Sequence, residues 1–129
     1  MIQTTLNFLE EQKKPLGYLL FLLTLLTLSL TLLPVDRVIT SNIWQYDKIA
    51  HAVLFGTWTF VLGLYLLFAT KKELPLFAIF LIGAFFGITI EILQEILPIN
   101  RTGDLNDALA DIFGCFIAVL ALKWLTRKA

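Results

Sequence analysis

The sequence has few of the residues on which many soluble and secreted proteins depend. A single cysteine, Cys115, excludes an intrachain disulfide. Only 16% of the 129 residues are charged and the formal net charge is zero. The chain therefore has no basic field of the kind that attracts nucleic acid, and we expect no nucleic-acid partner. The only histidine is His51, so any imidazole chemistry falls on that residue.

Apolar residues make up 58% of the chain. A soluble domain of this size keeps a large exposed surface and cannot bury so much apolar area, so part of the solvent must be lipid. Four runs are long enough for the roughly 20 apolar residues that a membrane helix needs. They are Leu16–Leu33, Ile49–Ala69, Leu74–Leu97 and Leu105–Leu125. We predict an all-α membrane protein whose four transmembrane helices form one compact bundle and a single domain over residues 1–129.

The four prolines mark the ends of two of these runs. Pro15 precedes the first run and Pro34 follows it, while Pro75 lies in the first turn of the third run and Pro98 follows that run. Proline is tolerated in the first turn of a helix and just past its end, but it breaks the interior. The proline positions therefore support the boundaries independently of hydropathy.

Glycines indicate how the helices pack. Gly83 and Gly87 form a GxxxG pair in the third run, and Gly56, Gly63 and Gly114 lie in the second and fourth runs. Small residues let membrane helices approach closely. Because the first run is dominated by leucine, we expect the last three runs to form the tight unit and the first to pack at its edge. Internal packing of the GxxxG pair is favoured over homodimerisation, and the oligomeric state is left open.

Basic residues predict the orientation. Seven of the ten lysines and arginines fall on one side of a four-span arrangement, and three fall on the other. The seven are Lys13, Lys14, Lys71, Lys72, Lys123, Arg127 and Lys128, and the three are Arg37, Lys48 and Arg101. The positive-inside rule then places both termini in the cytoplasm.

Ionisable residues gather at the outer side of this arrangement. They lie at the start of the second run, at the end of the third run, in the loop after it and at the start of the fourth run. Glu91 and Asp111 lie six residues inside their runs, or about 9 Å from the helix end at about 1.5 Å per residue. Ionisable groups at that depth need partners or water. Spacings of three or four residues put each set on one helix face, so three helices are expected to aim polar faces at one outward-opening pocket.

Several chemistries fit this pocket. His51, Glu91 and Asp107 are candidates for a catalytic acid and base, because crowding separates the pKa values of neighbouring groups. The candidate ligand-binding residues are Asp47, Lys48, Gln94, Arg101, Asp104 and Asp111. Lys48 and Arg101 suit a phosphate or carboxylate. The carboxylates and the imidazole also suit a divalent metal, although no particular metal or cofactor is indicated. An ion-pair network that only fixes helix packing is the alternative.

The order of these residues resembles the VanZ-like family. The matching elements are Asp47-Lys48-Ile49-Ala50-His51, then Glu91-Ile92-Leu93-Gln94, then Pro98, Arg101, Asp104, Asp107 and Gly114. The resemblance covers the chain from about Asp47 to its C-terminus. Two positions depart from the family pattern: Asp111, where members often carry asparagine, and Ala118, where a second small residue is usually glycine. Any role taken from an amide at position 111 does not transfer directly.

The resemblance implies a bacterial cytoplasmic-membrane protein whose polar pocket faces outside. The family is named for a protein linked to low-level resistance to teicoplanin, which binds peptidoglycan precursors. The main hypothesis is recognition or modification of a cell-envelope lipid or lipid-linked precursor. One alternative is an intramembrane hydrolase or transferase that uses acid–base or metal chemistry on a lipid-linked phosphate. Another is a proton-coupled transporter, which the apolar inner halves of the helices disfavour.

Overall fold

The structure is a computed structural model that describes residues 2–34, 44–70 and 75–127, with side chains from residue 11 in the first segment and from residue 46 in the second. It contains four helices: α1 (Ile2–Leu32), α2 (Trp44–Thr70), α3 (Leu76–Ile96) and α4 (Leu105–Arg127). Each is long and apolar enough to cross a membrane. The predicted all-α fold with four membrane-spanning helices is confirmed.

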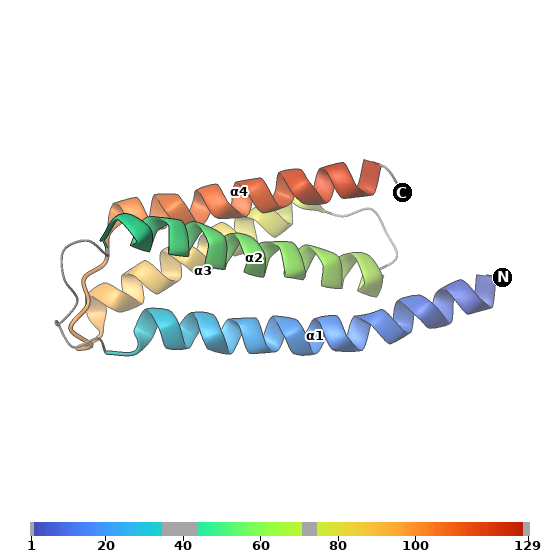
Figure 1. Ribbon diagram of the computed structural model, residues 1–129, viewed down its shortest axis with the longest axis horizontal. Coiled ribbons are helices and arrows are strands. Elements are labelled where there is room, and N and C mark those ends of the chain that lie inside the picture. The colour runs from blue at the N-terminus through green and yellow to red at the C-terminus, as the bar shows by residue number, and fades with distance from the viewer. Residues whose placement is uncertain (1, 35–43, 71–74, 128–129) are drawn as a thin grey trace.

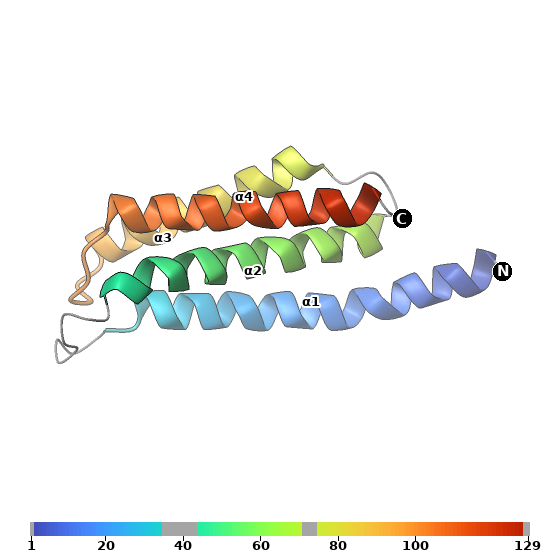
Figure 2. The ribbon, with the colours of Figure 1, turned by 45° about the horizontal axis from the view of Figure 1, so that its top comes forward.

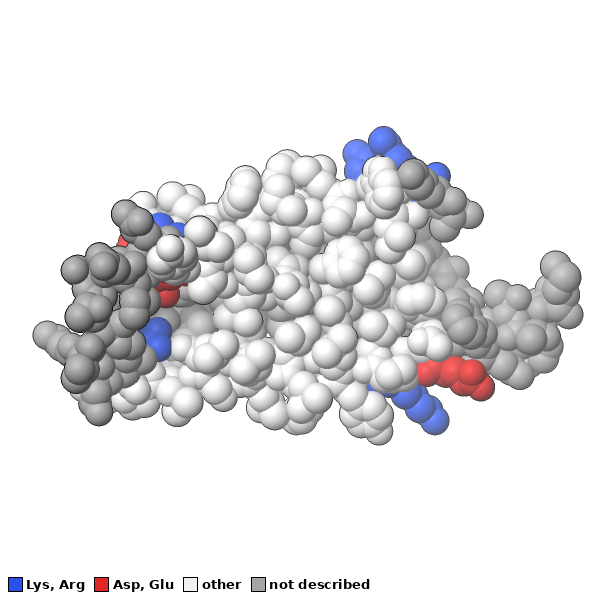
Figure 3. Space-filling model, viewed as in Figure 1, with Lys and Arg blue, Asp and Glu red and all other residues white. Residues whose placement is uncertain are grey.

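The helices run alongside one another (Figures 1 and 2). The start of α2, the end of α3 and the start of α4 lie together at one end, which we call the polar end. The start of α1 and the end of α4 lie at the opposite end, and the first turns of α1 extend beyond the other helices. On the face shown in Figure 3, lysine, arginine, aspartate and glutamate are confined to the two ends, and a broad band without them lies between. This band matches the hydrocarbon layer that the helices are long enough to span.

Two helices begin earlier than the sequence predicts. α1 starts at Ile2 and continues through Pro15, so the expectation that Pro15 precedes the helix is wrong. Proline is tolerated in long membrane helices because side chains, water or local adjustment can satisfy the freed backbone group. α2 starts at Trp44, five residues before the predicted Ile49. Some predictions concern positions outside the described residues. These positions are the basic residues Arg37, Lys71, Lys72 and Lys128, and Leu74 as the predicted start of the third run.

The closest helix crossing joins α2 and α4. A Cβ atom added to Gly114 would overlap the backbone of Ala52, with the Ala52 Cα at 2.9 Å. A Cβ atom added to Gly56 would lie 2.9 Å from the carbonyl oxygen of Gly114. Only glycine allows the two backbones to come so close. This crossing fixes the spacing of the helices that carry His51 and Asp111.

The GxxxG pair of α3 faces the other helices of the same bundle. A Cβ atom on Gly83 would meet Thr59 and Cys115, and a Cβ atom on Gly87 would lie 2.8 Å from the Cβ of Asp111. The pair therefore packs internally, as the sequence predicts. α1 lies at the edge: it packs mainly against α2, where the indole N–H of Trp58 donates to Thr24 at 2.9 Å.

Candidate functional site

His51 is the centre of the polar end. Four carboxylates surround it: Asp47 from α2, Glu91 from α3, and Asp107 and Asp111 from α4. We call these five residues the carboxylate–histidine cluster. Four-residue spacing puts Asp47 under His51, and it puts Asp107 under Asp111, on the inner face of each helix. Apart from Asp47, all members are buried. Three helices thus bring polar side chains together at this end, as expected from the sequence.

The two ring nitrogens of His51 face different carboxylates. Nδ1 lies 2.9 Å from Oδ1 of Asp111 in a buried hydrogen bond and 3.7 Å from Oε1 of Glu91. Nε2 lies on the other side, 4.0 Å from Oδ1 of Asp47. When Asp111 is ionised its carboxylate only accepts, and the tautomer of His51 that makes this bond carries its proton on Nδ1 and donates it to Asp111. His51 is thereby held in one orientation by a fully buried acid.

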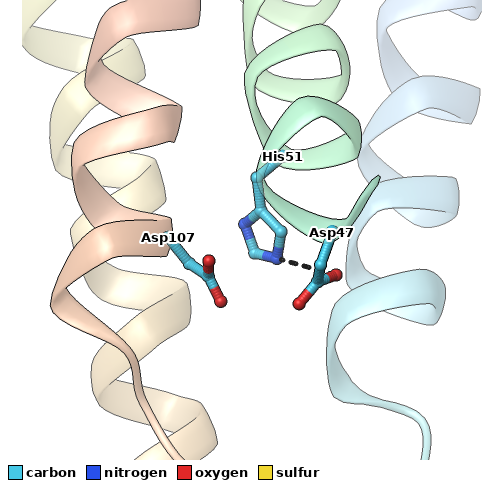
Figure 4. Close-up of side chains that lie close together, drawn as sticks. All are labelled: Asp47, His51 and Asp107. Carbon is cyan, nitrogen blue, oxygen red and sulfur yellow. Dashed lines mark ion pairs between the residues drawn. The ribbon is translucent and has the colours of Figure 1, made fainter. Parts of the chain in front are cut away.

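The Nε2 side opens toward the end of the bundle. Figure 4 shows the His51 ring between Asp47 and Asp107, with both carboxylates directed toward the space below the ring. Ligand atoms of these three residues lie within 4.8 Å of one another. We call them the open triad, because the Asp47 side chain is 41% exposed. Ligand atoms of a second set also lie within 4.8 Å of one another, and its three residues are all buried. We call His51, Glu91 and Asp111 the buried triad.

Two buried oxygens have no hydrogen-bond partner among the described residues: Oε1 of Glu91 and Oδ2 of Asp111. Buried polar atoms are nearly always paired, and an isolated buried charge is costly. Gly87 makes room for Asp111, since a Cβ atom there would lie 3.0 Å from its Oδ2. A proton or a cation near these oxygens would relieve the repulsion between the two acids.

Lys48 is held by two acids of α4. Its Nζ donates to Oδ1 of Asp107 at 2.7 Å and to Oδ2 of Asp104 at 3.2 Å. Asp104 also caps α4, because its Oδ1 accepts the backbone N–H of Asn106 at 2.8 Å. The pKa of the Asp104 carboxyl lies below its ordinary value, first because of the Asn106 N–H and then because of the Lys48 ammonium. The Lys48 ammonium therefore already pairs with two carboxylates and does not stand unpaired as an anion-binding group.

The loop before α4 is fastened to α3. Oε2 of Glu91 accepts the backbone N–H of Asp104 at 2.9 Å, and Oε2 of Glu95 accepts that of Gly103 at 3.0 Å. A Cβ atom on Gly103 would lie 2.7 Å from the carbonyl oxygen of Glu91, so the loop needs glycine at this point. These bonds set the position of Asp104 and, through it, the start of α4.

Arg101 and Gln94 cap the end of α1. Arg101 donates from Nη2 to the carbonyl of Leu30 at 2.9 Å and from Nε to that of Leu33 at 3.3 Å. Gln94 donates from Nε2 to the carbonyl of Thr31 at 2.9 Å. The last carbonyls of a helix have no partner within it, and a cation there also opposes the negative end of the helix dipole. Both residues thus tie α1 to the helices that carry the cluster.

Replacing Arg101 with alanine is expected to lower the thermal midpoint of the protein in detergent. The two carbonyls would lose their donor, and because both bonds are exposed to solvent we expect the loss of about 0.5–1.5 kcal/mol that is typical of one hydrogen bond. Arg101→Lys should lower it less, because lysine keeps the charge but not the two-pronged geometry. An equal midpoint for wild type and Arg101→Ala would show that the cap does not stabilise α1.

The structure thus places the sequence-predicted site residues in two groups. Asp47, His51, Glu91, Asp107 and Asp111 converge in the cluster, with Lys48 and Asp104 beside it. Gln94 and Arg101 instead contact the backbone of α1. The sequence does not predict that the end of α1 takes part in this end of the bundle. Every residue has a backbone carbonyl, so the sequence does not indicate which carbonyls accept these hydrogen bonds.

This arrangement suits proton transfer or cation binding. An imidazole oriented by a buried carboxylate is the pattern of a general base, and its free nitrogen must reach the reacting proton. An imidazole with two carboxylates is also a ligand set for a divalent ion. At the polar end, the described lysine and arginine side chains, Lys48 and Arg101, already donate to carboxylates and to backbone carbonyls.

The fold and this site define a multi-pass α-helical membrane protein with a carboxylate–histidine cluster at one end. The chain belongs to the VanZ/LLP1 family, whose family model matches residues 7–126. The family resemblance drawn from the spaced motifs is therefore confirmed, and the match extends over α1, which those motifs do not cover. No curated protein and no solved structure matches the chain.

Proposed function

We propose that the protein binds and modifies the head group of a cell-envelope lipid or lipid-linked precursor at the carboxylate–histidine cluster. The observation that carries the proposal is that three helices bring buried ionisable side chains together at one end of a membrane-spanning bundle. Such groups are costly in lipid and usually mark a functional site. The end of the bundle is also where lipid head groups begin.

The proposed setting is the outer face of a bacterial cytoplasmic membrane. The excess of lysine and arginine at the opposite end supports this orientation through the positive-inside rule. Envelope precursors that carry their polar group outside the cell would then meet the cluster. A change in glycopeptide susceptibility, including susceptibility to teicoplanin, would follow if the head group modified is that of a peptidoglycan precursor.

The hydrogen bond between His51 and Asp111 favours acid–base chemistry on the head group. With Nδ1–H donated to Asp111, Nε2 is the nitrogen available to accept a proton. It faces the exposed side of the cluster, where a head group can approach. The intramembrane hydrolase or transferase is therefore the enzymatic form of the same proposal.

Lipids that copurify with the protein test this proposal. Wild-type protein purified from membranes in mild detergent should be enriched in one class of polar lipid relative to the total extract, as measured by mass spectrometry. His51→Gln, which is close to histidine in size, should lose the enrichment while keeping its membrane abundance and thermal midpoint. Lys123→Gln, at the opposite end of the bundle, should keep the enrichment.

The same lipid profile in wild type and in a folded His51→Gln variant would contradict the proposal. Susceptibility of expressing cells to teicoplanin gives a second readout. If His51→Gln disappears from the membrane altogether, Asp107→Asn gives an independent comparison at the same site.

A further inference from the structure

Three acceptor groups of the cluster converge without a donor between them. The His51 ring lies between Asp47 and Asp107 with Nε2 4.0 Å from Oδ1 of Asp47, and one ligand atom from each of the three residues lies within 4.8 Å of the others (Figure 4). We propose that this open triad of Asp47, His51 and Asp107 binds a divalent transition-metal ion. The inference rests on the proposed function only for the role of the ion, since binding itself needs no lipid.

Asp111 prepares the imidazole for a metal. Its bond to Nδ1 leaves the lone pair of His51 on Nε2, which is the nitrogen that faces the open triad. In proteins, a histidine that binds a metal almost always donates its other ring N–H to a carboxylate or carbonyl, which fixes the tautomer and the ring orientation. The buried carboxylate behind His51 supplies that partner.

Nε2 of His51 has a carboxylate near it but no hydrogen bond to it. The His51 side chain is only 8% exposed, and Nε2 has no hydrogen-bond partner among the described residues, because Asp47 at 4.0 Å lies beyond hydrogen-bond distance. A lone pair and two carboxylates that face one point repel one another. A cation at that point removes the repulsion and satisfies all three groups.

Lys48 does not fill this role. Its ammonium donates to Oδ1 of Asp107 and to Oδ2 of Asp104, and no bond from it to Asp47 is present among the described residues. The other oxygen of Asp107 remains available as a metal ligand. Lys48 thus holds Asp107 in place while leaving the space below the ring open.

The ligand types select the class of ion. Imidazole suits zinc and other late transition ions, whereas carboxylates alone suit magnesium and calcium. Ligands bound at about 2.0–2.2 Å lie at most about 4.4 Å apart, so small side-chain rotations would close the triad around one ion. Three protein ligands leave a coordination position for water or substrate, as at catalytic zinc sites.

A bound ion would also resolve a conflict of charge. The described polar end carries more acids than bases. Its described lysine and arginine, Lys48 and Arg101, both already have hydrogen-bond acceptors. A phosphate-bearing head group would be repelled by such a surface. A divalent ion in the open triad would attract the phosphate oxygens and draw them to the exposed side of His51.

Metal binding to the purified protein tests the site directly. The protein, carrying no histidine tag, is stripped with a chelator, transferred to uncharged detergent without phospholipid, and titrated with Zn²⁺ by calorimetry. We expect one Zn²⁺ per chain. Asp47→Asn and Asp107→Asn should each weaken binding strongly, and Asp111→Asn should weaken it about 10–100-fold, because a neutral amide behind the ring makes the imidazole a less basic ligand. Glu95→Gln is the matched control, because it removes an acid at the same end outside both triads but leaves an amide oxygen that can still accept the N–H of Gly103.

The outcomes separate this inference from the proposed function. No saturable Zn²⁺ binding to folded wild type would overturn the metal site. Loss of binding in Glu91→Gln together with full binding in Asp47→Asn would overturn it too, because the ion would then lie in the buried triad. Zn²⁺ binding with the expected variant pattern but no lipid enrichment would uphold the metal site and overturn the proposed function instead.

Discussion

Gly114→Ala is expected to leave little folded protein in the membrane. The added methyl group would overlap the backbone of Ala52, which cannot rotate away as a side chain can. Overpacking of a side-chain core typically costs about 1–3 kcal/mol, and a backbone collision at the closest helix crossing should reach or exceed the upper part of that range. α2 and α4 would be pushed apart, and with them His51 and Asp111. Membrane abundance and thermal midpoint in detergent measure the effect.

Gly17→Ala is the matched control for that substitution. It makes the same chemical change within a helix, but the new Cβ atom would meet only the ring of Tyr65 at 3.4 Å, which is ordinary contact. Since alanine is the better helix former, Gly17→Ala should be neutral or slightly stabilising. Comparable losses from the two variants would mean that the α2–α4 crossing is not the tight point of the bundle.

Asp111→Ala should both destabilise the protein and remove the function of His51. Asp111 is fully buried, and its carboxylate is the hydrogen-bond partner of Nδ1. Without it, a buried N–H loses its acceptor, which costs about 1–3 kcal/mol, and the ring is no longer held toward Asp47 and Asp107. We expect a lower thermal midpoint and loss of the lipid enrichment seen with wild type.

Asp111→Asn distinguishes hydrogen bonding from charge. The amide oxygen can still accept the Nδ1–H of His51, so the fold should be retained close to the wild-type midpoint. If Asp111→Asn is as unstable as Asp111→Ala, the charge rather than the hydrogen bond holds the ring. A wild-type midpoint for Asp111→Ala would show that the bond contributes no stability.

The number and character of the helices could be predicted because lipid imposes a simple rule on the sequence. Every backbone group in the membrane must be satisfied internally, so each long apolar run forms a helix. The ends were less certain because they depend on what lies beyond the apolar run. Pro15 shows this: by itself it suggests a boundary, yet the helix continues on both sides of it.

The members of the cluster could be predicted because charge in an apolar run is conspicuous. Glu91 and Asp111 lie too deep to be explained as interfacial, and helical periodicity places His51 and Asp107 on the facing sides. The partners could not be predicted to the same extent. Arg101 looks like an anion-binding residue in the sequence, but its actual acceptors are the carbonyls of Leu30 and Leu33, which any residue would supply.

The cap on α1 has a consequence for the order of assembly. α1 is synthesised before α2 and α3, yet the donors for its final carbonyls, Gln94 and Arg101, come from the end of α3 and the loop after it. A chain that has made only α1 and α2 therefore lacks the donors that these three carbonyls have in the structure. Completion of α3 and of the loop after it supplies these donors, so α1 is fastened at the polar end just before α4 adds Asp107 and Asp111 to the site.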